Sequence, residues 1–302
     1  MSEVRSSTVK LIGAFAAIYI IWGSTYLAIR YAIHTMPSLL MASTRFLLAG
    51  SALYLWSKWK GAPRGSVKGW RQAGTLGALL FLCGNGGVVL AERSVPSGLT
   101  AVLVATVPLW VALLEWLMPG GRRPSMPVAA GILLGLAGVT LLISRDSVRT
   151  AGTVDPIAAS ILIFSSIAWC VGSLYARGTK ISESPWQASG MQMLCGGVLL
   201  LIASILTGEI RDFSPSRLSL QSVLALLYLT VLGSIVAFTA YSWLIKKTTP
   251  SKLSTYAYVN PAVAVVLGWA IGGEPLTSRM IFSMFVIVVA VILTTLPRSA
   301  AG

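Results

Sequence analysis

The sequence predicts an all-α membrane protein with ten transmembrane helices, arranged as two inverted five-helix repeats. Three observations support this fold class. Hydrophobic residues make up 55% of the 302 residues and charged residues only 11%, far below the roughly one quarter that is usual in soluble domains. Long apolar runs alternate with short polar gaps along the whole chain. Finally, motifs of the first half return in the second half.

The clearest repeat begins at Pro96. The segment Pro-Ser-Gly-Leu-Thr at 96–100 returns as Pro-Ser-Lys-Leu-Ser at 250–254, and a second proline follows in each copy, at Pro108 and Pro261. Further pairs of matching residues recur at offsets of 147 to 154 residues, which indicates a duplicated half of about 150 residues. The single membrane domain, residues 1–302, is therefore predicted to contain repeat 1 (10–144) and repeat 2 (156–296).

Each repeat supplies five apolar runs. A membrane-spanning helix needs about 20 predominantly apolar residues, and ten segments meet this requirement. They are 11–33, 37–57, 72–91, 96–117, 127–144, 157–177, 185–206, 220–244, 250–271 and 279–296. The gaps between them are short, so we expect one compact bundle without a separate soluble domain.

The basic residues predict the orientation. With the N-terminus inside, the inner segments hold 15 Lys and Arg residues and the outer segments 7, so the positive-inside rule places both termini in the cytoplasm. We therefore predict a multi-pass protein of the plasma (inner) membrane. Because each half has an odd number of spans, the halves must be inverted. Inverted repeats recur in secondary transporters, with the substrate site near the membrane midplane, although duplication could merely have built a larger bundle.

Two charged residues inside predicted spans are candidates for a functional role. Arg45 lies near mid-depth in the second span, where a charge is costly and usually faces the bundle interior. It could bind a carboxylate or phosphate of a substrate, or serve as a fixed counter-ion. Glu115 is the only carboxylate within a predicted span. It could carry a coupling proton if burial raised its pKa, or it could pair with Arg122 or Arg123.

Polar and kink-forming residues mark the third, fourth and ninth spans. Pro108 and Pro261 fall at mid-span in both halves, where proline removes a backbone hydrogen bond and kinks or breaks a helix. Asn85 stands in a glycine-rich stretch and Asn260 directly before Pro261. Each amide could tie two helices together or line a cavity, and the kink beside Asn260 favours the cavity for that residue.

Aromatic side chains cluster at membrane depth. Trp22 and Trp169 lie too deep for an interfacial belt. They could form the mostly apolar wall of a small-molecule pocket or simply pack in the core. The aromatic candidates for the cavity wall are Trp22, Tyr26, Trp110, Trp169, Tyr241 and Tyr258.

Several functional classes find little support. His34 is the only histidine, and the three cysteines lie in separate apolar runs, so neither a metal site nor a cofactor is predicted. The net charge of +14 is explained by membrane topology, so no nucleic-acid partner is expected. No P-loop, GxSxG or HExxH motif occurs, which disfavours ATP-driven or enzymatic readings.

The order of these motifs resembles the ten-helix EamA branch of the drug/metabolite transporter superfamily over essentially the whole chain. The resemblance rests on Ile-Trp-Gly-Ser-Thr-Tyr at 21–26, on Arg-Phe-Leu-Leu-Ala-Gly at 45–50, on the helices of Pro108 and Pro261, and on Gly-Glu-Pro-Leu-Thr at 273–277. It implies inverted five-helix repeats around a central cavity, and export of amino acids, related metabolites or toxic organic compounds. Arg45 and Glu274 match family-typical positions, although the first half has no counterpart of Glu274.

We therefore predict a secondary transporter that exports small organic metabolites, amino acids first among them, by alternating access through a midplane cavity. Its expected partners are a small-molecule substrate and the lipid bilayer, and a monomer is compatible with the sequence. A multidrug exporter of the same fold, a membrane-embedded lipid-modifying enzyme and a binding protein derived from a transporter are the alternatives. The sequence does not fix the substrate or the coupling ion.

Overall fold

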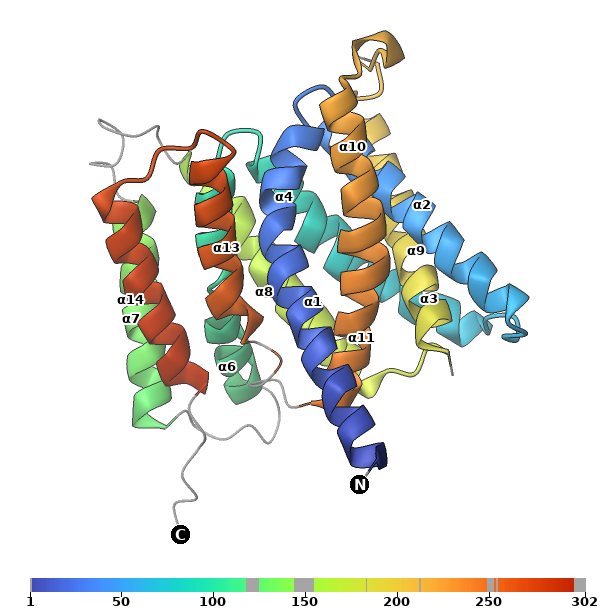
Figure 1. Ribbon diagram of the computed structural model, residues 1–302, viewed down its shortest axis with the longest axis horizontal. Helices are drawn as coiled ribbons and strands as arrows, with labels where there is room; N and C mark the ends of the chain where they lie inside the picture. Colours follow the sequence, from blue (N-terminus) through green and yellow to red (C-terminus); the bar gives the residue numbers. More distant parts are fainter. Residues whose placement is uncertain are drawn as a thin grey trace.

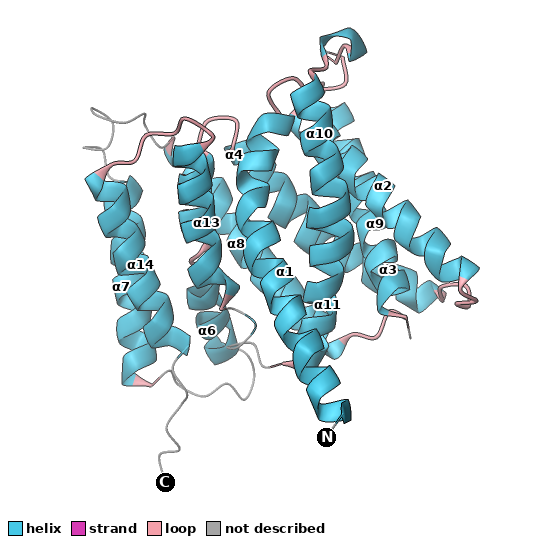
Figure 2. Cartoon of the chain, viewed as in Figure 1, coloured by secondary structure: helices cyan, strands magenta, loops and turns pink. Residues whose placement is uncertain are grey.

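A computed structural model describes residues 2–117, 125–143, 155–182, 184–211, 213–248, 253 and 255–295. Within these residues every regular element is a helix and there is no strand (Figure 2). Helix α1 (Ser2–Ala32) begins, and α14 (Ser278–Thr295) ends, at the same end of one bundle (Figure 1). The all-helical part of the predicted fold class is therefore confirmed.

The remaining helices follow the predicted spans along the chain. The first half adds α2 (Ser38–Trp59), α3 (Val67–Leu76), η1 (Gly77–Gly86), α4 (Gly87–Ala91), α5 (Ser97–Val104), α6 (Val107–Leu117) and α7 (Met126–Ile143). The second half adds α8 (Pro156–Gly178), α9 (Pro185–Leu206), η3 (Pro215–Arg217), α10 (Leu220–Tyr228), η4 (Leu229–Val236), α11 (Ala237–Lys247) and α13 (Tyr256–Ala270). Ser66, Asp155, Ser184 and Ser219 cap the helices that follow them, as their short polar side chains favour.

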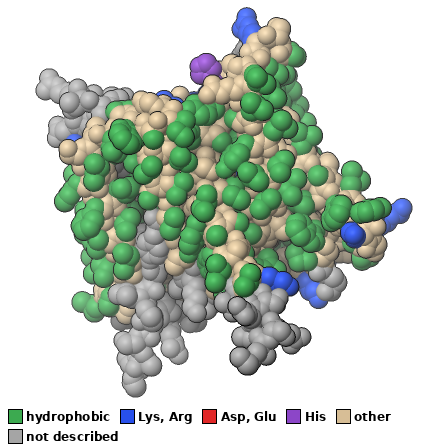
Figure 3. All heavy atoms as spheres, viewed as in Figure 1, with side chains coloured by type: hydrophobic (Ala, Val, Ile, Leu, Met, Phe, Trp, Pro, Cys, Tyr) green, Lys and Arg blue, Asp and Glu red, His purple; other side chains and the backbone are tan. Residues whose placement is uncertain are grey.

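The outer surface of the bundle is apolar. Seven of the described helices are long and apolar enough to cross a membrane, and three shorter apolar helices accompany them, at 126–138, 259–270 and 278–290. Hydrophobic side chains cover the flank seen in Figure 3, whereas Lys and Arg lie toward its ends. Large side chains such as Leu133, Ile202 and Phe285 are more than 45% exposed. An apolar surface of this extent fits contact with lipid rather than with water.

Two continuous helices contain a π-helical stretch that the sequence analysis did not predict. The stretch η1 joins α3 to α4, and η4 joins α10 to α11. The two stretches begin 152 residues apart, within the range of offsets found between the sequence motifs. Because π turns are rare and often occur at functional sites, their equivalent positions direct attention to the space between η1 and η4.

The helix packing keeps the same pattern when the two halves are exchanged. Helix α1 packs on α13 and on the α10–η4–α11 helix, and α8 packs correspondingly on α5, α6 and the α3–η1–α4 helix. Helices α2 and α9, α5 and α13, and α7 and α14 form the remaining main pairs. This exchange symmetry is what a two-fold relation between the halves would produce.

Helices α2 and α9 run antiparallel and approach closely. Gly50 lies against Gly190 and Leu194, whereas Leu47 lies against Gly197 farther along α9. Ser43 Oγ also donates a hydrogen bond to the carbonyl oxygen of Gly197, at 2.9 Å. Small residues at such contacts let two helix backbones come together.

The contact between η1 and α9 allows a matched test of this packing. A Cβ at Gly77 would lie 2.7 Å from the backbone nitrogen of Gly196, whereas a Cβ at Gly74, one turn earlier, would meet nothing within 4 Å. We expect Gly77→Ala to lower the free energy of unfolding by about 1–3 kcal/mol through overpacking. Gly74→Ala should leave it unchanged or raise it slightly, because alanine favours helices.

Thermal and chemical unfolding of both variants, purified in the same detergent, measures this difference. Equal stability of the two variants would show that η1 and α9 do not pack as closely as described.

Candidate functional site

A cavity of about 80 Å³ lies in the centre of the bundle, between helices of both halves. Its wall is mostly apolar and aromatic with a few polar groups, which is the usual composition of a small-molecule site. The aromatic lining residues are Trp22, Tyr26, Phe46, Phe81, Trp169, Phe238 and Tyr256. The polar lining residues are Thr25, Arg45, Asn85, Ser165, Ser166 and Asn260. The volume accommodates several water molecules, so a larger solute would require the helices to move apart.

Arg45 brings a positive charge to this wall. Its side chain is only 4% exposed, and its Nε donates a hydrogen bond to Ser234 Oγ in η4, at 2.7 Å. A Cβ at Gly233 would lie 2.9 Å from one terminal nitrogen of Arg45, so the guanidinium fits here because position 233 has no side chain. No described residue accepts a hydrogen bond from either terminal nitrogen.

A guanidinium with unused donors can bind a carboxylate or a phosphate by two parallel hydrogen bonds. The carbon at the centre of the guanidinium also lies 4.7 Å from the ring centroid of Phe46, so an aromatic face stabilises the cation as well. Arg45 therefore presents unused donors of the kind that suit an anionic group, in a cavity whose wall is mostly apolar.

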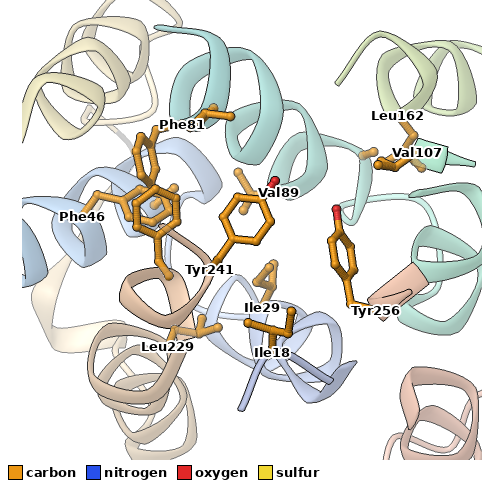
Figure 4. Close-up of a cluster of buried hydrophobic side chains, with 14 of the residues drawn as sticks. Ile18, Ile29, Phe46, Phe81, Val89, Val107, Leu162, Leu229, Tyr241 and Tyr256 are labelled. Carbon is orange, nitrogen blue, oxygen red and sulfur yellow. The ribbon is translucent and has the colours of Figure 1, made fainter. Parts of the chain in front are cut away.

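The aromatic residues form a connected cluster. The ring of Trp22 lies 5.6 Å from that of Trp169, 4.9 Å from that of Tyr241 and 5.6 Å from that of Tyr256. Figure 4 shows Tyr241 between Phe46 and Tyr256 in the core. The Trp22 Nε1 donates to the carbonyl oxygen of Gly233, at 3.2 Å, so the π-helical backbone of η4 holds the ring in place. The cluster thereby links α1, α8, α11 and α13 around the cavity.

The two asparagines line the cavity and also bind their surroundings. Asn85 Nδ2 donates to the carbonyl oxygen of Leu80, five residues earlier, at 3.0 Å, a spacing that fits the π-helical geometry of η1. The Asn260 amide nitrogen, in the orientation that satisfies its neighbours, donates to the carbonyl oxygens of Ile18, Tyr19 and Tyr256. Asn260 thus ties α13 to α1, so the two roles considered for this residue are compatible.

Three of the other aromatic candidates occupy different places. Trp110 lies in α6, where its Nε1 donates to Thr106 Oγ1 at 3.1 Å, and it does not line the central cavity. Tyr241 lies behind Trp22 and bonds to Ser173 Oγ at 2.7 Å, so it supports the wall without lining it. The side chain of Tyr258 is outside the described residues.

The prolines and Glu115 lie apart from the wall. A turn at Ala105 and Thr106 separates α5 from α6, and Pro108 is the second residue of α6. Pro261 lies inside α13, which remains helical around it. Glu115 is half-buried near the end of α6 and does not line the central cavity.

At the end of the bundle where α1 ends, two glutamates of the second half cap helices of the first half. Glu274 accepts hydrogen bonds from Ser97 N (2.8 Å), Ser97 Oγ (2.6 Å) and Gly98 N (3.0 Å) at the start of α5, and from Arg30 Nη1 (2.8 Å). Glu209 similarly accepts from Ser38 Oγ and from two backbone amides at the start of α2. Carboxylates favour helix N-termini because of the exposed amides and the helix dipole, so each contact holds the halves together.

A second, more basic cavity of about 490 Å³ opens at the other end of the bundle. Its charged lining residues are Arg177, Lys180, Lys246 and Lys247. Lys246 Nζ donates to the carbonyl oxygens of Ala176, Arg177 and Thr179 at the end of α8. Phe238 lines both this basic cavity and the central cavity, so an aromatic side chain separates the two.

The reasoning from sequence missed Glu92, which is buried one residue beyond the predicted third span. A search for carboxylates beside the ends of apolar runs, as well as inside them, would have found it. It also left Tyr256, Phe46 and Phe81 out of the wall. Depth alone does not tell which side of a helix faces a cavity.

Comparison with known proteins agrees with this arrangement. The EamA-like transporter family matches residues 10–144 and again residues 156–296. The chain is 41% identical over 290 residues to the uncharacterized inner membrane transporter YedA of Escherichia coli (strain K12), covering 95% of this chain and 91% of that protein. It is 26% identical to a WAT1-related chloroplastic protein of Arabidopsis thaliana, with 93% and 68% coverage. Among the solved structures that match, one crystal structure has a TM-score of 0.66 at 20% identity, covering 95% of this chain and 98% of that chain.

The fold and its lipid-compatible surface define a multi-span membrane protein, and the family match shows that it is a transporter. The chain belongs to the EamA-like transporter family.

Proposed function

We propose that the protein is a secondary transporter that exports small organic metabolites, amino acids first among them, through the central cavity by alternating access. The observation that carries this proposal is the placement of Arg45, with unused hydrogen-bond donors, in an aromatic cavity between the two halves. Binding of its carboxylate to Arg45 would place the common part of an amino acid beside an aromatic wall. The side chain would occupy space that forms as the helices move apart.

The exchange symmetry of the packing supports the proposal of inverted repeats, with halves at 10–144 and 156–296. Counterpart helices α2 and α9 are antiparallel, as a two-fold axis in the membrane plane requires. Two inverted halves can exchange conformations, so the cavity would open to one side and then to the other.

The proposed orientation places the N-terminus in the cytoplasm. The basic cavity around Arg177 and Lys246 then faces the cytoplasm, and the contacts of Glu274 and Glu209 close the outer end. The excess of basic residues on the inner side supports this assignment. Export would begin at the basic cavity, pass the aromatic layer at Phe238 and end by separation of the outer contacts.

Counterflow in proteoliposomes tests the function. Vesicles loaded with an unlabelled amino-acid mixture should accumulate labelled amino acids only when they contain the protein, and accumulation should depend on the internal mixture. Protein-free vesicles loaded identically are the control. An absence of flux for every amino acid would overturn amino-acid export.

A toxic-compound exporter is a second candidate, favoured by the apolar and aromatic character of most of the cavity wall. The same vesicles, tested with an aromatic monocarboxylate such as benzoate and with a lipophilic cation such as tetraphenylphosphonium, discriminate between substrates. Arg45 predicts transport of the anion in preference to the cation.

A further inference from the structure

Glu92 is a buried carboxylate that the proposed cavity does not use. It follows α4 directly, and the residue is only 5% exposed. Neither of its carboxylate oxygens has a hydrogen-bond partner among the described residues. Burying an ionised carboxylate without hydrogen bonds is costly, so this site favours the protonated, neutral form.

The position of Glu92 connects it with the cavity. Val88 lines the cavity, and the Glu92 backbone nitrogen donates to the Val88 carbonyl oxygen at 3.0 Å. Residues four apart share one face of a helix, so Glu92 lies one turn beyond the cavity wall. Its carboxylate oxygens do not line the cavity, so they cannot contact a solute bound there. A proton is small enough to reach them without a cavity of that size.

The charged neighbours of Glu92 come from several elements. Arg45 in α2, Arg30 and Tyr26 in α1, and Glu274 before α14 all interact electrostatically with it. Helix α8 also packs on α4. The acidic residue next to α8, Asp155, caps the N-terminus of α8 by accepting a hydrogen bond from Ile157 N. Glu92 itself lies one residue past the span at 67–91.

Burial raises the pKa of the Glu92 carboxyl well above its ordinary value, with Glu274 adding to the rise and Arg30 and Arg45 opposing it. The raised pKa agrees with the absence of hydrogen bonds to the two Glu92 oxygens, which disfavours the ionised form. The attraction to Arg45 means that the charge on one residue depends on the charge on the other.

We propose that Glu92 is a proton-binding site coupled to Arg45, so that a proton on Glu92 and an anionic group on Arg45 each strengthen the binding of the other. Ionised Glu92 partly offsets the positive charge of Arg45, and protonation removes this offset. By thermodynamic reciprocity, an anion at Arg45 raises the proton affinity of Glu92 by the same factor. In the closed conformation a Glu92 oxygen carries a proton taken from water. When the outer end of the bundle opens, water reaches Glu92 and the proton returns to water.

The sign of this coupling has a functional consequence, which rests on the proposed transport function. Proton and anionic group bind together and leave together, so transport of a carboxylate would carry a proton in the same direction. The protein would then be a co-transporter of the two and not an exchanger of one for the other.

Infrared spectroscopy of the full-length protein in lipid vesicles tests the site without any substrate. The carbonyl band of a protonated carboxyl group should be present at pH 7 and disappear as the pH is raised further, because burial holds the pKa of Glu92 well above its ordinary value. Glu92→Gln should remove this band, whereas Glu115→Gln should keep it. Arg45→Gln should shift the midpoint upward by about one unit, because a nearby positive charge is lost.

A band that is absent at pH 7, that survives in Glu92→Gln, or whose midpoint is unchanged in Arg45→Gln would overturn the proposal. Glu92→Asp, which retains a carboxyl group, should retain a titrating band at a different midpoint. This conservative variant decides the question if Glu92→Gln does not yield folded protein.

Counterflow of the labelled amino-acid mixture at pH 6 and pH 8 separates this inference from the proposed function. Exchange by the unaltered protein should depend on pH. The change should be up to about tenfold for each unit by which a bound anion shifts the Glu92 midpoint. Exchange by Glu92→Gln should be the same at both pH values. Loss of the infrared band in Glu92→Gln without any flux in the unaltered protein would leave the proton site standing and remove amino-acid transport. Flux with an unchanged pH profile in Glu92→Gln would remove the coupling and leave transport.

Discussion

Arg45→Gln is expected to reduce exchange of carboxylate substrates by at least about 30-fold. Arg45 is the charged residue of the central cavity wall, and its terminal nitrogens have no acceptor among the described residues. Removing one partner of a buried charged contact costs about 2–5 kcal/mol, and each 1.4 kcal/mol is a factor of ten in affinity. The measurement is the concentration dependence of counterflow, which reports affinity and maximal rate separately.

Three further variants identify the cause of such a loss. Arg45→Lys keeps the charge without the planar pair of donors, so it should recover only part of the exchange. Ser234→Ala removes the hydrogen bond that positions Nε and should have a smaller effect. Arg71→Gln, on the exposed face of α3, is the control and should exchange as the unaltered protein does.

The thermal stability of Arg45→Gln distinguishes binding from a structural role. If Arg45 binds substrate, its buried charge lowers the stability of the substrate-free protein, because desolvation of the charge is not fully compensated. Removing the charge should then leave the unfolding temperature unchanged or raise it. Unaltered exchange together with a lowered unfolding temperature would show that Arg45 is a fixed counter-ion.

The sequence allowed the depth of the candidate side chains to be predicted, but not the direction in which they point. Trp22 and Trp169 lie too deep for an interfacial belt, and they meet edge to face at the cavity wall. Trp110 stands in an equally apolar span but bonds to Thr106 away from the wall. A membrane helix is apolar on every side, so its hydrophobic pattern carries little information about rotation around its axis.

Burial that depends on distant segments was also beyond the sequence. Glu92 follows an apolar run and reads as a residue of a water-exposed turn, yet Arg30 and Glu274 are among the groups that act on it. Similarly, the resemblance marked the turn at Glu274, but the bonds to Ser97 and Gly98 join residues more than 170 positions apart. The π-helical stretches were missed because η1 and η4 interrupt helices whose composition is uniformly apolar.

Glu274→Ala is expected to lower the free energy of unfolding by about 1–3 kcal/mol, the cost of leaving buried hydrogen-bond donors without an acceptor; the Arg30 side chain is 42% exposed and can be solvated instead. The Glu274 side chain is 3% exposed and pairs with Arg30, and its loss leaves two backbone amides and the Ser97 hydroxyl without an acceptor. Glu274→Gln retains one acceptor oxygen and should cost less. Glu209→Ala is the matched control, since Glu209 caps α2 in the same way at a more exposed position.

Chemical unfolding alone does not tell whether the Glu274 contact opens during transport, but labelling does. Thr100 is fully buried in α5, one turn past the amides that Glu274 holds. If the contact is the proposed outer closure, a Thr100→Cys variant should react with a membrane-impermeant maleimide faster once Glu274→Ala is added. Both reactions are compared with the same proteins without the new cysteine. Reduced stability with unchanged labelling would mean that Glu274 is a static cap on α5, and the outer closure would then have to lie elsewhere.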